Sequence, residues 1–150
     1  MTKKIFTNRR AARFFVVQAL YQMEHLDQPL QLLLDEFRSL HLHDKSHAFA
    51  RDTNGALFEY IVQGVHQHGN DLDEKIQEVL SVEWPLERLD AVVRAVLRAS
   101  AFELLFDVET PLPVIISEYL EVSKIFLAQG EVTFIHVVID KLGSLLRSSD

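Results

Sequence analysis

Basic side chains crowd the beginning of this 150-residue chain, and their type and spacing are suited to binding phosphate. Two lysines and three arginines lie within the first 13 residues, whereas the first acidic residue is Glu24. The five cations are Lys3, Lys4, Arg9, Arg10 and Arg13. An arginine guanidinium donates parallel N–H bonds to phosphate oxygens and stacks on bases. The cluster therefore favours binding of RNA or DNA.

The rest of the chain carries the opposite charge. The whole sequence has 15 basic and 22 acidic residues, and residues 24–150 hold ten of the former and all of the latter, a charge of −12. Such a body repels a polyanion everywhere except at the basic head, residues 1–13. The competing interpretation is a solvated helix start without a ligand. Against it, an arginine at the positive end of a helix dipole costs about 0.3–1 kcal/mol.

The first predicted helix begins near Asn8, ends at about His25 and is apolar on two sides. Its expected core face carries Ala12, Phe15, Val16, Ala19 and Met23. The arginines fall on a neighbouring arc, so we expect them to point to solvent. A second apolar strip consists of Phe14, Val17 and Tyr21. Such a strip is either sandwiched within the protein or presented to a partner, and both interpretations remain open.

Patterns typical of catalysis or metal binding do not occur in the sequence. There is no cysteine, and the histidine runs "HLHDKSH" and "HQH" match no structural-zinc spacing, so neither a metal nor a cofactor is expected. No GxSxG, P-loop, dinucleotide or HExxH motif is present, and we expect no enzymatic activity. The sequence also lacks a membrane-span or signal-peptide pattern, which predicts a cytoplasmic protein.

The elements that position these residues are predicted to be helices, because apolar residues follow helical spacing nearly throughout the chain. We expect an all-α fold of about seven helices in a single domain, residues 1–150. The predicted helices cover residues 8–25, 29–41, 54–69, 71–80, 86–106, 114–127 and 134–146. The Trp84-Pro85 corner separates an N-terminal half, to about residue 81, from a C-terminal half over about 85–147.

Two further groups of charged residues have simple structural explanations. Arg94 and Arg98 are one helical turn apart and fit a surface ion-pair ladder. Glu118, Glu121 and Lys124 fit a solvated helix face with an ion pair to the lysine. We therefore expect neither group to form a functional site.

Six segments of the chain form a recognisable succession. They are "RRAARFFVVQALYQ", "LFEYIVQGVHQH", "LDEKI", "RLDAVVRAVLRASAFELL", "PLPVIISEYLEVSKIF" and "TFIHVVIDKL". In this order they resemble the NusB family of bacterial transcription antitermination factors over almost the whole chain. The resemblance implies two packed three-helix halves with an additional helix. It also implies a factor that binds boxA-type ribosomal RNA leader sequence with NusE, a small-subunit ribosomal protein, and suppresses termination by RNA polymerase.

The resemblance, carried over by position, assigns RNA binding to the basic head and to one aromatic residue. These residues are Lys3, Lys4, Arg9, Arg10, Arg13 and Phe134. Phe134 corresponds to an aromatic residue near the RNA surface of the family, where a ring stacked on an unpaired base contributes about 1–3 kcal/mol.

The resemblance also bears on partner binding. Tyr21 corresponds to a family tyrosine near the NusE-facing side, and with it we assign Phe14 and Val17 to partner binding. The alternative is a homodimeric interaction module that buries this strip between two chains and binds RNA weakly or not at all. The chain departs from the common family pattern at several positions of its C-terminal half, namely Ser117, Tyr119, His136 and Val137.

Overall fold

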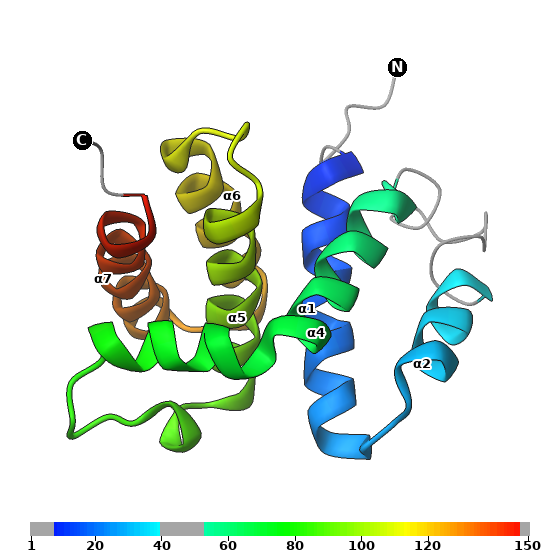
Figure 1. Ribbon diagram of the computed structural model, residues 1–150, viewed down its shortest axis with the longest axis horizontal. Coiled ribbons are helices and arrows are strands. Elements are labelled where there is room, and N and C mark those ends of the chain that lie inside the picture. The colour runs from blue at the N-terminus through cyan, green and yellow to red at the C-terminus, as the bar shows by residue number, and fades with distance from the viewer. Residues whose placement is uncertain (1–7, 40–52, 148–150) are drawn as a thin grey trace.

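The computed structural model describes residues 8–39 and 53–147, and within these ranges every regular element is helical (Figure 1). The elements are α1 (Asn8–Leu26), α2 (Leu30–Phe37), α4 (Gly55–Val79), the 3₁₀ turn η2 (Leu86–Arg88), α5 (Ala91–Phe106), α6 (Leu112–Phe126) and α7 (Gln129–Leu146). The prediction of an all-α fold with about seven helices is thus confirmed. The predicted site residues Lys3 and Lys4, and the histidines at 41, 43 and 47, lie outside the described residues.

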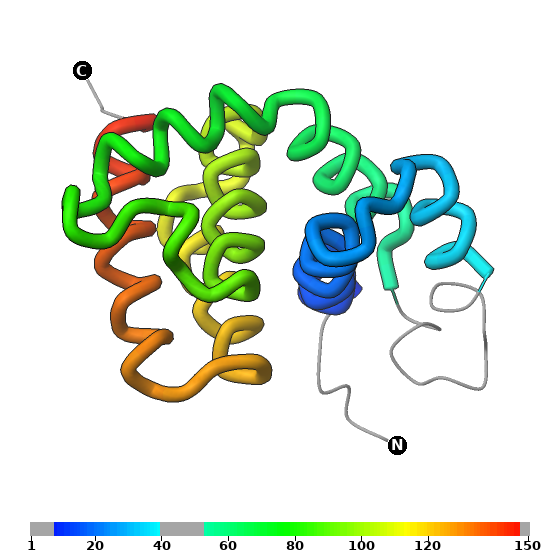
Figure 2. The backbone as a smooth tube through the Cα atoms, turned by 90° about the horizontal axis from the view of Figure 1, so that it is seen from below, coloured from blue at the N-terminus to red at the C-terminus, as the bar shows by residue number. Residues whose placement is uncertain are grey.

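Helix α5 is the central element, in contact with α1, α4, α6 and α7. Figure 1 shows α1 and α2 on one side of the molecule and α5, α6 and α7 on the other. Helix α4 joins the two groups, and Figure 2 shows it passing along one edge from α2 to α7. The N-terminal end of α1, which carries the arginines, lies against α5 and α6, two helices far away in the sequence.

Helix α4 is longer than the sequence predicted, because it continues past Gly69 to Val79. His68 has non-helical angles, φ −107° and ψ 17°, and marks a kink rather than an end. Beyond the kink Leu72 and Ile76 are buried, so tertiary packing continues the helix where local signals favoured a stop. Before the kink, α4 approaches α5 closely: a Cβ atom added to Gly64 would lie 2.1 Å from the ring of Phe102.

The beginnings of α4, α5 and α7 show how well local sequence signals predicted the first residue of a helix. The side chain of Asn54 accepts a hydrogen bond from the Leu57 amide at 2.9 Å and so caps α4 at the residue where this helix was predicted to begin. Asp90 caps α5 in the same way through the Val92 amide at 2.8 Å, so this helix begins five residues later than predicted. Helix α7 instead begins earlier, at Gln129, where Glu131 accepts a hydrogen bond from the Ala128 amide.

The hydrophobic core is continuous between the two groups of helices. On α2, Leu33, Leu34 and Phe37 are buried, whereas Leu32 is 56% exposed. No described helix combines the length and the apolarity that crossing a membrane requires.

Candidate nucleic-acid interface

The three arginines of α1 occupy three different environments. Arg9 is exposed, and Arg10 exposes 24% of its side chain. Arg13 exposes only 2%, so the prediction that all three point to solvent is wrong for this residue. The physical reason is the packing of α1 against both α5 and α6, which buries every residue from Ala11 to Val17.

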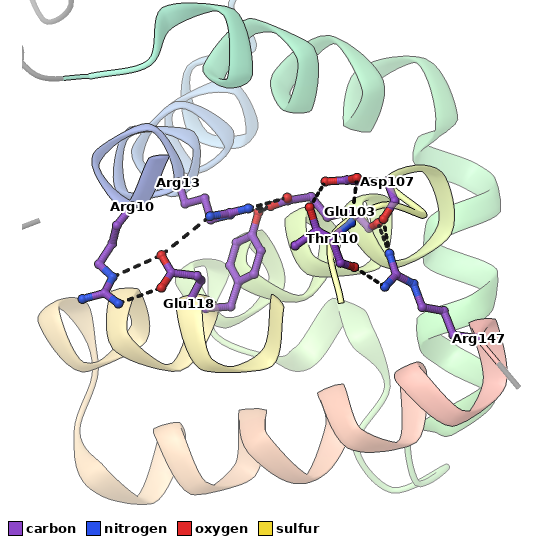
Figure 3. A network of polar contacts seen from close by, with 8 residues as sticks. Arg10, Arg13, Glu103, Asp107, Thr110, Glu118 and Arg147 are labelled. Carbon is purple, nitrogen blue, oxygen red and sulfur yellow. Dashed lines mark hydrogen bonds and ion pairs between the residues drawn. The ribbon is translucent and has the colours of Figure 1, made fainter. Parts of the chain in front are cut away.

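Arg13 is held by a buried carboxylate on α5 (Figure 3). Its Nε and Nη2 atoms donate to the two carboxylate oxygens of Glu103, each at 2.8 Å, and Glu103 is fully buried. The hydroxyl of Tyr119, on α6, donates to the same carboxylate. Burial opposes the charge of Arg13, but the hydrogen bonds to Glu103 and the surrounding negative charges outweigh it and raise the pKa of the guanidinium. Arg13 is therefore a permanent internal cation.

Tyr119 completes this network as a neutral donor. The side chain is fully buried, and the Arg13 guanidinium lies 5.8 Å from the centre of its ring. Burial and the nearby charge of Glu103 raise the pKa of the phenol well above its usual value. The hydroxyl thus keeps its proton and its hydrogen bond to the carboxylate throughout the neutral range.

Arg10 is paired with a second carboxylate, also on α6. Its Nε and Nη2 atoms donate to Glu118 at 3.2 and 2.7 Å, and this pairing raises the pKa of Arg10. Glu118 is 14% exposed and lies 3.6 Å from Nη1 of Arg13, so it contacts both arginines. The interpretation of Glu118 as part of a solvated face is thus wrong, whereas the predicted pair of Glu121 and Lys124 forms at 3.0 Å.

Arg9 lies near the C-terminal end of α5. Burial opposes ionisation of Asp107, but hydrogen bonds from Thr110 lower its pKa, and the charge of Arg9 adds a smaller effect in the same direction. The Thr110 hydroxyl is 2.6 Å from the Asp107 carboxylate. Arg147 covers this helix end by donating to backbone carbonyls, including that of Leu104 at 2.8 Å. Figure 3 places this cluster beside the Arg13 network.

The predicted partner strip is divided between core and surface. The ring of Phe14 stacks on that of Phe126, with centroids 5.0 Å apart, and Val17 is 1% exposed. For these two residues the sandwiched interpretation is confirmed. Tyr21 is 42% exposed, with its ring 4.2 Å from that of His25.

An open groove of about 570 Å³ lies beside Tyr21. Its lining includes His25 and Leu26 from α1, Phe37 from α2 and Val92 from α5. Phe134, the remaining predicted RNA contact, lies on α7 and packs partly against the core. It comes from a different element than the arginines, and its contact with RNA stays a prediction.

Glu103, the buried carboxylate that pairs with Arg13, was not identified from the sequence. Its signal is a single acidic residue inside the apolar run "AFELLF" of α5, among positions that a helix buries. Arg94 and Arg98 were predicted to form a ladder along α5. Instead they reach other helices, both to Glu24 on α1 and Arg98 also to Asp73 on α4. Within residues 8–39 and 53–147 no cluster of acidic and histidine side chains could hold a metal ion.

Comparisons with known proteins agree with this arrangement of helices. The model of the NusB family matches residues 10–143. A protein of Bradyrhizobium diazoefficiens named transcription antitermination protein NusB is 36% identical over 154 residues, covering 100% of this chain and 92% of its own. A protein of the same name from Maricaulis maris is 40% identical over 141 residues, covering 89% and 84%.

Two solved structures have a similar fold. The NusB structure of T. maritima superposes with a TM-score of 0.74 at 26% identity and covers 93% of each chain. A chain from a structure of the antitermination factors NusB and NusE in complex with dsRNA superposes with a TM-score of 0.76. It covers 91% of this chain and 96% of its own at 18% identity, a likeness that concerns the fold.

Proposed function

Because the chain belongs to the NusB family, we propose that it is a non-catalytic RNA-binding factor that suppresses termination by RNA polymerase together with NusE. Its relatives carry the name transcription antitermination protein, and a NusB of the same fold has been solved with NusE and double-stranded RNA. The RNA implied by the family resemblance is the boxA-type leader sequence. The factor would act in the cytoplasm, where that transcript is made.

The observation that carries this proposal is the placement of Arg9 and Arg10 at the N-terminal end of α1, in a chain whose net charge is −7. Both side chains reach the surface, Arg10 only in part. The opposite charge of the body concentrates a polyanion at this end. Lys3 and Lys4 would add charge there, and the ring of Phe134 would stack on an unpaired base.

The role proposed for Arg13 differs from the RNA contact that the sequence suggested. With 2% of its side chain exposed it lies beneath the surface, clamped to Glu103. We assign it a positioning part: it fixes the first turns of α1 against α5, so that Arg9 and Arg10 are presented in a constant orientation. Direct contact with RNA is assigned to Arg9 and Arg10.

The partner contact is proposed for Tyr21 and the groove beside it. Phe14 and Val17 support this surface from the core and are not proposed to touch the partner, because they pack inside the protein. The same burial weakens the alternative of a homodimer held by the whole strip, since two of its three members are unavailable to a second chain.

The test is a salt titration of binding to a single-stranded boxA-type RNA and a scrambled strand, with and without NusE, followed by fluorescence anisotropy. Arg9→Ala should weaken binding and reduce the salt slope by about 0.7 for each phosphate that the variant no longer neutralises. Arg88→Ala is the matched control, because it removes the same charge from the exposed η2 turn, at the opposite end of the molecule from the start of α1 (Figure 1). Equal effects of the two substitutions, or equal binding of both strands, would contradict the proposal.

A further inference from the structure

Glu118 occupies the edge of Arg10 that a phosphate would use. The Nε and Nη2 atoms of Arg10 present the two parallel N–H bonds that bind a carboxylate or a phosphate in bidentate fashion. In this structure both bonds are made to the two oxygens of Glu118, with the shorter at 2.7 Å. A phosphate approaching this edge therefore meets a carboxylate already in place, and like charges repel.

Glu118 also has a second cation within reach. Its Oε1 atom lies 3.6 Å from Nη1 of Arg13, on the buried side of the network (Figure 3). If the carboxylate leaves Arg10, it remains beside a guanidinium that is fixed by Glu103. Displacement from Arg10 thus does not leave the carboxylate as an unpaired charge in a place that is only 14% exposed.

We propose that Glu118 is an affinity-determining residue of the RNA interface: it holds the Nε–Nη2 edge of Arg10 in the free protein, and an RNA phosphate displaces it toward Arg13. An isolated phosphate ion competes poorly with a carboxylate that is part of the same molecule. A phosphate in an RNA strand, held in place by neighbouring contacts such as Arg9, has a high effective concentration and competes well. Glu118 therefore lowers the affinity for small anions more than the affinity for a continuous strand.

This inference rests on the proposed function, and its test uses the isosteric substitution Glu118→Gln in the full chain. Without the carboxylate charge, binding of the boxA-type RNA should tighten by about three- to tenfold. The salt slope should become steeper by up to about 0.7, because a phosphate at Arg10 then no longer has to displace the Glu118 carboxylate. Inorganic phosphate, added as a competitor, should displace the RNA more readily from the variant than from the parent protein.

The matched control is Glu121→Gln, on the same helix. It removes the same charge, but Glu121 is hydrogen-bonded to Lys124 at 3.0 Å instead of Arg10. The charge of Glu121 also acts on Arg10, but more weakly than the hydrogen bond and the charge of Glu118. The effect of Glu121→Gln on RNA binding should therefore be about twofold or less, since salt screens exposed charges. A gain in Glu118→Gln that only equals this control would overturn the inference, because Glu118 would then act through its charge alone and not through its bonds to Arg10. A loss of affinity would also overturn it, because Glu118 would then be a support that RNA binding needs.

A second variant connects the effect to Arg10. In the Arg10→Ala background the substitution Glu118→Gln should no longer tighten RNA binding, whereas an undiminished gain would contradict displacement from Arg10. Glu118→Asp serves where the glutamine variant folds poorly: it keeps the charge but shortens the side chain, so it should also loosen the pair and tighten binding.

The two proposals fail in distinguishable ways. If neither Arg9→Ala nor Arg10→Ala weakens RNA binding, the proposed function of this surface is wrong. If both weaken it and Glu118→Gln binds like the Glu121→Gln control, the interface stands and only the displacement of Glu118 is wrong.

Discussion

Ion pairs hold α1 and α5 together at both ends of their interface, and the helix that supplies the cation differs between the two ends. At the first end α1 supplies the cation, Arg13, and α5 supplies the anion, Glu103. At the second end α1 supplies Glu24, and α5 supplies Arg94 and Arg98. Because each helix carries one sign of charge at each end, the pairs form only when the helices run antiparallel. The charges thus specify a direction that apolar packing alone would leave open.

The two ends differ in burial, and burial determines what each contributes. Arg13 and Glu103 expose 2% and 0% of their side chains, whereas Arg94, Arg98 and Glu24 expose 13%, 25% and 31%. Losing one member of a buried pair leaves a charge without water or partner, whereas a partly exposed charge is solvated again. Among the described residues no buried side-chain nitrogen or oxygen lacks a hydrogen-bond partner.

The largest effect is expected from Glu103→Gln, which removes the carboxylate that accepts both hydrogen bonds of the buried Arg13 guanidinium and leaves only Glu118, 3.6 Å away, as a nearby anion. The free energy of unfolding should fall by about 3–5 kcal/mol. Urea unfolding followed by circular dichroism measures this loss. The control is Arg13→Met combined with Glu103→Leu and Tyr119→Phe, which removes both charges and the hydroxyl and should recover most of the stability. A loss below about 1 kcal/mol for Glu103→Gln would mean that the buried ion pair contributes no more to the free energy of unfolding than an exposed one.

This buried pair also shows where sequence reasoning reached its limit. The sequence indicated that Arg9, Arg10 and Arg13 share one end of a helix, and that was right. It could not indicate which arc of the helix a distant element covers, because α5 and α6 reach this end from about 90 and 108 residues away along the chain. Arg13 thus differs from Arg9 through tertiary packing alone.

The next largest effect is expected from Tyr119→Phe, which removes one donor from the buried carboxylate but keeps the ring. A hydrogen bond to a charged group contributes about 1.5–3 kcal/mol, and unfolding by urea should show a loss in this range. Tyr60→Phe is the matched control, since Tyr60 is 47% exposed and its hydroxyl can be solvated. Equal stability of the two variants would mean that Arg13 alone satisfies Glu103.

Much of the fold could be predicted because its signals are local. Apolar spacing, together with the cap at Asn54, gave the starts of α1 and α4 within about one residue. The errors arose where a local signal competes with packing. Gly69 is compatible with a helix end, yet the burial of Leu72 and Ile76 continues α4 through the kink at His68. The cap of α5 at Asp90 was available in the sequence but was outweighed by the apolar pattern from Leu86.

The smallest effect is expected at the exposed end, from Glu24→Gln. Hydrogen bonding to Arg94, with the charges of Arg94 and Arg98, lowers the pKa of Glu24 below its ordinary value of 4.5. The carboxylate is therefore favoured in the folded protein, so its contribution is present above pH 4.5 and is lost as the pH falls through the lowered pKa. At neutral pH the substitution should cost about 1 kcal/mol or less, and less still at high salt.

Urea unfolding of the parent protein and of Glu24→Gln, repeated between neutral pH and about pH 3, measures this dependence. The two stabilities should converge as the pH falls, because protonated glutamic acid and glutamine are both neutral. Glu103→Gln should differ in its response to salt: loss of the buried pair should cost the same at low and at high ionic strength, since salt does not reach it. A salt-dependent loss at Glu103, or a salt-independent loss at Glu24, would reverse the contrast between the two ends of the interface.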